Sequence, residues 1–168
     1  MRYWLGLGSN LGDRAAQLAA ALASLARAGV RVEAVSPVYE TAPRDLLDQP
    51  AFLNAAARVA TDLAPPDLLR LVKRTERDLG RTAGPRYGPR AVDCDLLLWD
   101  GGAFRDADLT IPHPRLGERR FALLPLLDLD PDLALPDGRR LADIAGAIDP
   151  AEQPAARRPE PLAAPQLD

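Results

Sequence analysis

The folds available to this chain are restricted most strongly by two amphipathic segments, each followed by a glycine. Between Asp13 and Ala28, leucines at positions 18, 22 and 25 form one stripe, and Gly29 follows. The second segment begins at the pair Pro65-Pro66, and its stripe consists of Leu68, Leu69, Val72 and Leu79 before Gly80. Apolar residues three to four apart followed by glycine are typical of helices that pack on one side. The chain therefore contains two helices that need a surface to cover.

Four β-type segments supply that surface. Residues 2–8 mix aromatic and aliphatic side chains, 30–40 alternate, and 51–62 and the run Leu96–Trp99 are apolar. With the helices, the order is strand, helix, strand, strand, helix, strand. This split βαβ order predicts an α+β ferredoxin-like sandwich, in which an antiparallel four-stranded sheet (βαββαβ) carries both helices on one face.

The length and composition fit one domain. At 168 residues and 47% hydrophobic content, the chain can bury one core but not two comfortable ones. Residues 119–129 and 140–147 predict two further short helices. Five prolines follow Asp149. We therefore expect a single domain over 1–149 and a poorly ordered Pro/Ala-rich tail over 150–168.

Charge and cysteine content exclude several classes of protein. The net charge of −3 argues against a general nucleic-acid or membrane-surface binder, which would need a basic excess. Cys94 is the only cysteine, so the sequence has no disulfide framework and no thiol cluster for zinc. With no signal or membrane segment evident, we expect a cytoplasmic protein that is a monomer or weak dimer.

One segment is strongly basic. Residues 70–90 hold seven basic and two acidic side chains, which favours a small anionic ligand. A solvated helix face followed by a loop is the alternative. The glycines of GLGSNLG do not have dinucleotide-binding spacing, and a turn that caps the first helix explains that motif. The chain also lacks a Walker-type phosphate loop.

The stronger chemical signal is the pair Asp93 and Asp95 at the start of the last strand. Side chains at i and i+2 of a strand point to one face, about 6.5 to 7 Å apart along the chain. Two carboxylates can bind Mg²⁺, which completes its coordination with water and phosphate oxygens. A surface pair neutralised by nearby arginines is the structural alternative.

Cationic residues on both sides of this pair favour a metal–nucleotide site. Arg81, Arg86 and Arg90 precede it, while His113, Arg119 and Arg120 follow. Guanidinium groups bind phosphate oxygens through two donors and stay charged. His113 is the only histidine and lies between two prolines, which suits a positioned donor.

Several motifs together resemble the 6-hydroxymethyl-7,8-dihydropterin pyrophosphokinase family. They are GLGSNLGDR, SPVYETAP, QPAFLNAA, LGR, RYGPRAVDCDLLLWDG, LTIPHPRLGERRFALLPL and PDG, in that order over roughly residues 1–145. The segments G-P-R-x-x-D-x-D and I-P-H-P are the most specific. The resemblance implies the ferredoxin-like fold and transfer of pyrophosphate from ATP to the hydroxymethyl group of the pterin, with release of AMP, in folate biosynthesis.

The resemblance also implies roles for individual residues. Asp93 and Asp95 would bind two Mg²⁺ ions. The catalytic set would be Arg81, Arg90, His113 and Arg119. The ATP site would contain Glu76, Arg81, Arg86, Tyr87, Arg90, Leu96, Thr110, His113 and Arg119. The pterin site would contain Thr41, Pro43, Phe52, Asn54, Asp93 and Phe121. Two rings suit a flat heterocycle, and an amide suits its alternating donor and acceptor edge.

Two other functions share parts of this pattern. Another Mg²⁺-dependent nucleotidyl or phosphoryl transferase could use the same carboxylates and arginines. RNA-recognition domains also present a four-stranded sheet, but they need aromatic side chains on its open face. With 5% aromatic residues and acidic groups on the last strand, this chain fits RNA poorly. We therefore expect ATP and the pterin as partners, with no nucleic acid and no membrane.

Overall fold

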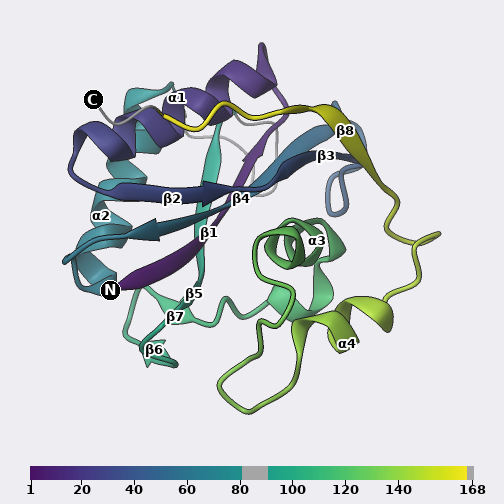
Figure 1. The fold of residues 1–168 in the computed structure, drawn as a ribbon. Helices are drawn as coiled ribbons and strands as arrows, with labels where there is room; N and C mark the ends of the chain where they lie inside the picture. Colours follow the sequence, from purple (N-terminus) through teal and green to yellow (C-terminus); the bar gives the residue numbers. More distant parts are fainter. Residues whose placement is uncertain (81–90, 166–168) are drawn as a thin grey trace.

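A computed structural model describes residues 1–80 and 91–165. Its elements are β1 (Arg2–Ser9), α1 (Arg14–Arg27), β2 (Arg31–Val35), β3 (Pro37–Thr41), β4 (Phe52–Ala60), α2 (Pro65–Asp78), β5 (Asp93–Trp99), β6 (Phe104–Arg105), β7 (Thr110–Ile111), a 3₁₀ helix η1 (Leu116–Glu118), α3 (Arg120–Leu129), α4 (Leu141–Gly146) and β8 (Ala155–Pro161). The protein is α+β with an antiparallel sheet, as predicted (Figure 1).

Among the described residues, the main sheet has six strands rather than the four expected. Its order is β5-β1-β4-β3-β8, and β2 also pairs with β4. One of the additional strands arises because the predicted strand 30–40 is divided at Ser36. The Ser36 backbone N–H donates to the Ala56 carbonyl at 2.9 Å, and the Ser36 Oγ accepts from the Ala56 N–H at 2.8 Å, so a side-chain oxygen enters the pairing as β2 gives way to β3.

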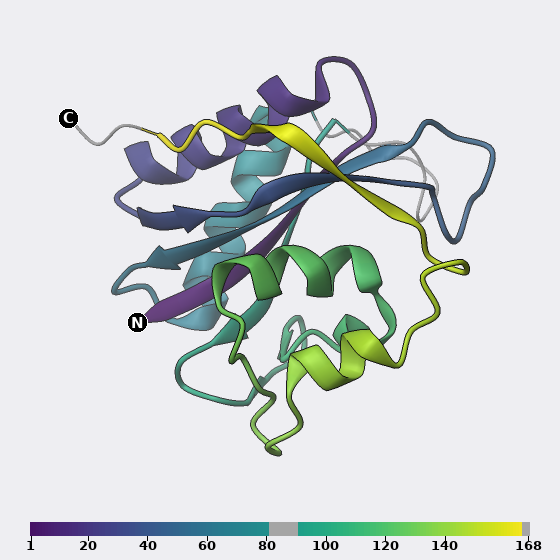
Figure 2. The same ribbon diagram turned by 45° about the vertical axis from the view of Figure 1, so that its right-hand side comes forward.

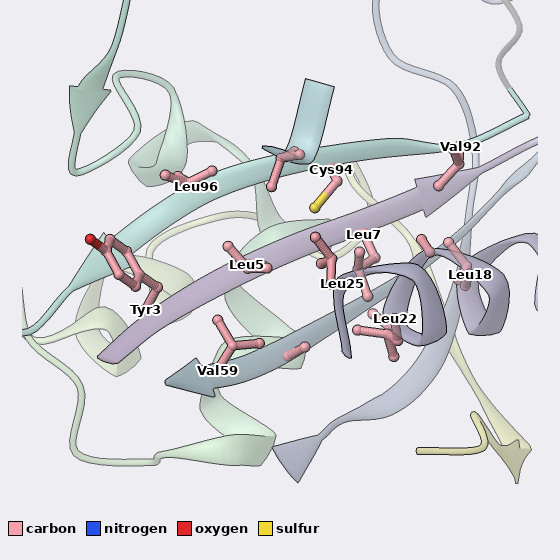
Figure 3. Packing of buried hydrophobic residues seen from close by; sticks show 14 of the residues in the cluster. Tyr3, Leu5, Leu7, Leu18, Leu22, Leu25, Val59, Val92, Cys94 and Leu96 are labelled. Carbon is pink, nitrogen blue, oxygen red and sulfur yellow. The ribbon is translucent and has the colours of Figure 1, made fainter. Parts of the chain in front are cut away.

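Helices α1 and α2 cover one face of the sheet, as predicted (Figure 1). Leu18, Leu22 and Leu25 of α1 are fully buried against β1 and its neighbours (Figure 3). The Asp13 side chain caps α1 by accepting from the Ala16 N–H at 3.1 Å. Gly29, with φ of 88°, follows the helix in the left-handed conformation that glycine adopts without strain.

Helix α3 covers the opposite face, which the predicted fold had left open, and α4 packs against α3 and η1. Alternate residues of a strand face opposite sides, and on β5 Leu96 joins the core under α1 and α2 whereas Leu97 packs with α3. Leu123 and Leu126 of α3 are fully buried in this second core. The sheet is therefore a central layer between two hydrophobic cores (Figure 2).

The C-terminal segment differs from the frayed tail that the sequence predicts. Residues 155–161 form β8, which pairs with the edge of β3 along the sheet (Figure 2). Two prolines, Pro159 and Pro161, lie in this strand. Proline lacks an N–H donor but is tolerated in edge strands, where one side of the backbone needs no partner. The proline content that argued against a strand is therefore compatible with this position.

None of the described helices is long and apolar enough to cross a membrane.

Candidate active site

The floor of a cavity is formed where β4, β1 and β5 lie side by side. Gly8 of β1 pairs with Asn54 of β4 on one side and Asp93 of β5 on the other. Gly6 is likewise paired with Asp95. Asn54, Asp93 and Asp95 line the cavity together with the two glycines, which have no side chains. Because directly paired residues point to the same face, the glycines leave space between the carboxylates and the amide.

Gly8 allows an unusually close approach. A Cβ atom at this position would lie 3.2 Å from Asn54 Oδ1. The sequence motif GLGSNLG therefore contributes to the cavity as well as to the turn before α1, a role that the sequence analysis missed. Only the pairing of β1 with β4 and β5 reveals it, since glycine spacing alone does not specify which strands flank it.

Asp93 and Asp95 both line the cavity, as expected for alternate residues of one strand. Burial, followed by the charge of Asp93, raises the pKa of Asp95 to about 6. Lys73 and Arg119 oppose this rise through their positive charge. A second carboxylate close enough to disfavour the ionisation of Asp95 makes this a region that attracts a cation.

Polar and aromatic groups occupy the other end of the floor. Asn54 is buried, and its Nδ2 donates to Thr41 Oγ1 at 2.6 Å. Since Nδ2 is bonded to Thr41, Oδ1 is the amide atom of Asn54 that faces Gly8. Phe52 and Phe121 both line the cavity, from β4 and α3 respectively. The structure thus brings together Thr41, Phe52, Asn54, Asp93 and Phe121 of the predicted pterin set.

Arg119 lines the cavity at the start of α3. Its guanidinium carbon lies 5.6 Å from the centre of the Phe121 ring, within range of a cation–π contact. Burial, followed by the charge of Arg115, lowers the pKa of Arg119. The group stays charged at neutral pH nonetheless, because the ordinary pKa of a guanidinium is far above 7.

The segment between β3 and β4 forms a wall of the cavity with Arg44, Asp45 and Gln49, which were not predicted individually. Arg44 Nη1 donates to the Glu118 carbonyl at 2.6 Å. Asp45 pairs with Arg115 at 3.3 Å. These two contacts join the wall to η1, which is distant in sequence, so no local pattern could have indicated them.

His113 lies beside this site without lining the cavity. Its backbone N–H donates to the Leu97 carbonyl at 2.9 Å, and its Nδ1 accepts from the Arg115 N–H at 3.1 Å. Burial, followed by the charge of Arg119, lowers the pKa of His113 to about 4. The imidazole is therefore neutral at pH 7, and because Nδ1 is an acceptor, the proton is on Nε2.

Four other predicted residues also lie outside the cavity lining. Pro43 lies between the lining residues Ala42 and Arg44, and Thr110 lies in β7 beside β5. Leu96 is buried in the core beneath α2. Glu76 is also buried, and its Oε1 accepts from the Cys94 N–H at 2.7 Å, between the two aspartates. Arg81, Arg86, Tyr87 and Arg90 lie outside the described residues.

The carboxylates suit Mg²⁺ better than a metal held entirely by protein. Within residues 1–80 and 91–165, no three His, Cys, Asp or Glu side chains are grouped to form a metal cage. Mg²⁺ is commonly bound by one or two carboxylates, together with water and substrate phosphates. The raised pKa of Asp95 also fits, because a bound cation would favour the ionised carboxylate. The cavity residues therefore match the chemistry of this ion.

Comparison with known proteins identifies the family. Residues 4–131 match the family described as 7,8-dihydro-6-hydroxymethylpterin-pyrophosphokinase (HPPK). The chain belongs to the HPPK family. This confirms the resemblance seen in the sequence motifs, and the match includes every described cavity residue from Gly6 to Ala122.

HPPK relatives occur both as short proteins and within longer ones. The chain is 43% identical over 150 residues to a 2-amino-4-hydroxy-6-hydroxymethyldihydropteridine pyrophosphokinase from Methylorubrum extorquens, covering 89% of the chain and 94% of the relative. The corresponding Pseudomonas aeruginosa protein is 42% identical over 147 residues, covering 87% and 91%. A mitochondrial folate synthesis bifunctional protein from Pisum sativum is 46% identical over 125 residues, covering 74% and 24%. The chain thus spans about a quarter of the length of the plant proteins that it matches.

Proposed function

We propose that this protein transfers pyrophosphate from ATP to the hydroxymethyl group of 6-hydroxymethyl-7,8-dihydropterin, a step of folate synthesis. The observation that carries the proposal is the cavity, where two carboxylates, a guanidinium, two rings and a buried amide converge in an HPPK-family chain. In this reaction the hydroxymethyl oxygen forms a bond to the β-phosphorus. The bond from that phosphorus to the α–β bridging oxygen breaks, AMP departs, and the hydroxyl proton is lost.

The pterin occupies the aromatic end of the cavity in this proposal. Its flat ring lies between Phe52 and Phe121, while Asn54 hydrogen-bonds its polar edge. Because Thr41 accepts from Asn54 Nδ2 at 2.6 Å, it sets the orientation of the amide. Pro43, in the adjacent wall, and Asp93, across Gly8 from Asn54, complete the proposed pterin contacts.

Asp93 and Asp95 would hold the two proposed Mg²⁺ ions. When bound, Mg²⁺ would neutralise phosphate charge and polarise the attacking hydroxyl group. Glu76 supports this region, because its bond to the Cys94 N–H fixes the backbone between the two aspartates. Burial raises the pKa of the Cys94 thiol well above its ordinary value, so this residue is not proposed as a nucleophile.

The phosphate groups are bound by cationic and neutral donors. Arg119 faces the carboxylates from α3, and His113 offers an Nε2 proton without adding charge. Arg81 and Arg90, together with these two residues, form the proposed catalytic set. Arg86, Tyr87, Thr110, Glu76 and Leu96 complete the proposed ATP site. Since phosphoryl-type transfer depends mainly on alignment and charge stabilisation, these groups suffice without a strong base.

The proposal also covers the fold type, the cellular location and the oligomeric state of the protein. A ferredoxin-like unit is formed by β1, α1, the β2–β3 segment, β4, α2 and β5. The C-terminal elements are added to it. The strand order β5-β1-β4-β3 supports this relation. We also propose a cytoplasmic enzyme that acts as a monomer or weak dimer and binds no nucleic acid.

A product assay tests the function. Incubation with ATP, Mg²⁺ and 6-hydroxymethyl-7,8-dihydropterin should yield AMP and a pterin diphosphate in equal amounts, and omission of Mg²⁺ should abolish both. Separation of nucleotides by ion-exchange chromatography distinguishes the outcomes. ADP or free pyrophosphate as the by-product would instead indicate a different nucleotide-dependent transferase.

A further inference from the structure

Gln153 lies in the C-terminal segment that follows the region matched by the family, residues 4–131. A turn fixes it on one side, where its backbone N–H donates to the Asp149 carbonyl at 3.2 Å. Two residues later β8 begins, with Ala155 paired to Thr41 of the cavity. The segment is therefore held between a turn and an edge strand, and it carries Gln153 to one place beside α3.

The side chain of Gln153 bonds to the two peptide groups that flank Arg119. Its Oε1 accepts from the Arg120 N–H at 2.9 Å, and its Nε2 donates to the Glu118 carbonyl at 3.0 Å. The Gln153 carbonyl also accepts from Arg120 Nη1 at 3.0 Å. Gln153 thus makes two hydrogen bonds to the peptide groups on either side of a cavity-lining arginine and a third to the side chain of Arg120.

These bonds supply a partner for a backbone N–H group that α3 itself leaves unpaired. Arg119 is the residue before α3 and has an extended conformation, with φ of −117° and ψ of 92°, between η1 and α3. The side chain of Arg119 does not cap α3 with a hydrogen bond. The first N–H groups of a helix have no partner within the helix, so the Gln153 amide supplies one from a distant part of the chain.

The backbone at Arg119 determines where its guanidinium can lie. An arginine side chain has many rotamers, and ordering it on a ligand costs conformational entropy. Because the backbone is already fixed on both sides of Arg119, less conformational entropy is lost when the side chain binds an anionic group. The contact of Arg119 with the Phe121 ring at 5.6 Å depends on the same start of α3.

We infer that Gln153 is a positioning residue, which orients Arg119 toward the triphosphate by bonding the peptide groups on either side of it. This inference rests on the proposed function only in that Arg119 binds the nucleotide. It assigns a role in the site to a segment that the sequence predicted to be a poorly ordered tail.

A double-mutant cycle tests the inference through binding rather than turnover. The full-length protein, Gln153→Met, Arg119→Ala and the double variant are titrated by calorimetry with a non-hydrolysable ATP analogue and Mg²⁺. Methionine preserves the length of the side chain but removes its hydrogen bonds. Glu152→Met, at the neighbouring exposed position, is the matched control and should bind as the unmodified protein does.

Gln153→Met should weaken analogue binding about fivefold to tenfold, a coupling within the range for residues in contact. In the Arg119→Ala background, the same change should alter binding less than about twofold. Equal weakening in both backgrounds would overturn the inference, because Gln153 would then act independently of Arg119. Unchanged binding in Gln153→Met would overturn it as well.

A second variant covers the case in which Gln153→Met does not fold. Gln153→Glu keeps an acceptor for the Arg120 N–H but loses the donor to the Glu118 carbonyl, so its loss of affinity should again depend on Arg119. If the unmodified protein binds the analogue but yields no AMP and pterin diphosphate, the proposed function fails while the cycle still reports on Gln153. Absence of analogue binding by the unmodified protein would overturn both.

Discussion

Asp95 illustrates how a single residue acquires its properties from its neighbours. It is paired with Gly6, lines the cavity and lies close to Asp93. Burial and this second carboxylate raise the pKa of Asp95 to about 6. In the absence of a cation, an ionised Asp95 therefore opposes folding, since its charge is more easily accommodated in water.

Replacement of Asp95 by asparagine should separate function from stability. Loss of one electrostatic contact in a transition state typically lowers kcat by about 10²-fold to 10³-fold. The melting temperature at pH 7 without metal should stay the same or rise, because the cost of a buried charge and its repulsion from Asp93 are both removed. Steady-state kinetics and thermal melting check the two effects. A variant that lost cooperative melting would show that the carboxylate serves the core instead.

At the residue scale, the sequence predicted several of the groups that line the cavity but not their state. Asp93, Asp95, Phe52, Asn54 and Phe121 were predicted, and all line the cavity. The neutral form of His113 and the close contact at Gly8 were not predictable, since both depend on burial by distant segments. A pattern identifies a side chain, whereas its protonation and free space are tertiary properties.

At the scale of elements, β8 shows where local reasoning failed. The helices α1 and α2 were predictable because their apolar stripes and glycine stops are local signals. A proline-rich strand has no such signal, because it is stabilised by its partner β3 and by the side chains that it brings. Beyond the strand, Leu162 is buried in the core beneath α1 and α2.

Leu162→Ala should therefore destabilise the protein although the residue lies in the expected tail. Removal of a buried leucine side chain costs about 2–5 kcal/mol, and we expect the lower half of this range near a chain end. Urea unfolding followed by circular dichroism measures the difference. Leu47→Ala, at a position with 73% exposure, is the matched control and should change stability by less than about 0.5 kcal/mol. Equal stability of both variants would mean that residues after β8 do not contribute to the core.

At the scale of the whole molecule, a charge network extends over the sheet far from the cavity. Glu33 of β2 pairs with Arg2 of β1 at 2.7 Å, with Arg31 at 3.0 Å and with Arg58 of β4 at 3.3 Å. Hydrogen bonding and charge from Arg2, with further contributions from Arg31, lower the pKa of Glu33 to about 2. Only the folded arrangement of three strands gathers these groups.

The network makes stability depend on pH in a defined direction. The pKa of Glu33 is about 2 when folded and 4.5 for an ordinary glutamate, so its contribution is complete above pH 4.5 and is lost as the pH falls toward 2. Because Arg2 is half exposed, solvent screening limits the effect to on the order of 1 kcal/mol. Glu33→Gln should be less stable by this amount at pH 7, and chemical unfolding at several pH values should show the difference disappear near pH 2. A difference that persisted at pH 2 would contradict an electrostatic origin.

The cavity combines two kinds of construction. Its floor consists of the paired strands β5, β1 and β4, with Gly8 paired to both Asn54 and Asp93 and closely packed against Asn54. Its wall at residues 42–49 is an exposed connection that lies outside the sheet. Substitutions in the floor would disturb strand pairing, whereas wall positions other than Pro43, Arg44 and Asp45 can vary at less cost. An inhibitor designed against the floor would consequently leave few routes to resistance, and escape mutations against larger compounds should accumulate in the wall.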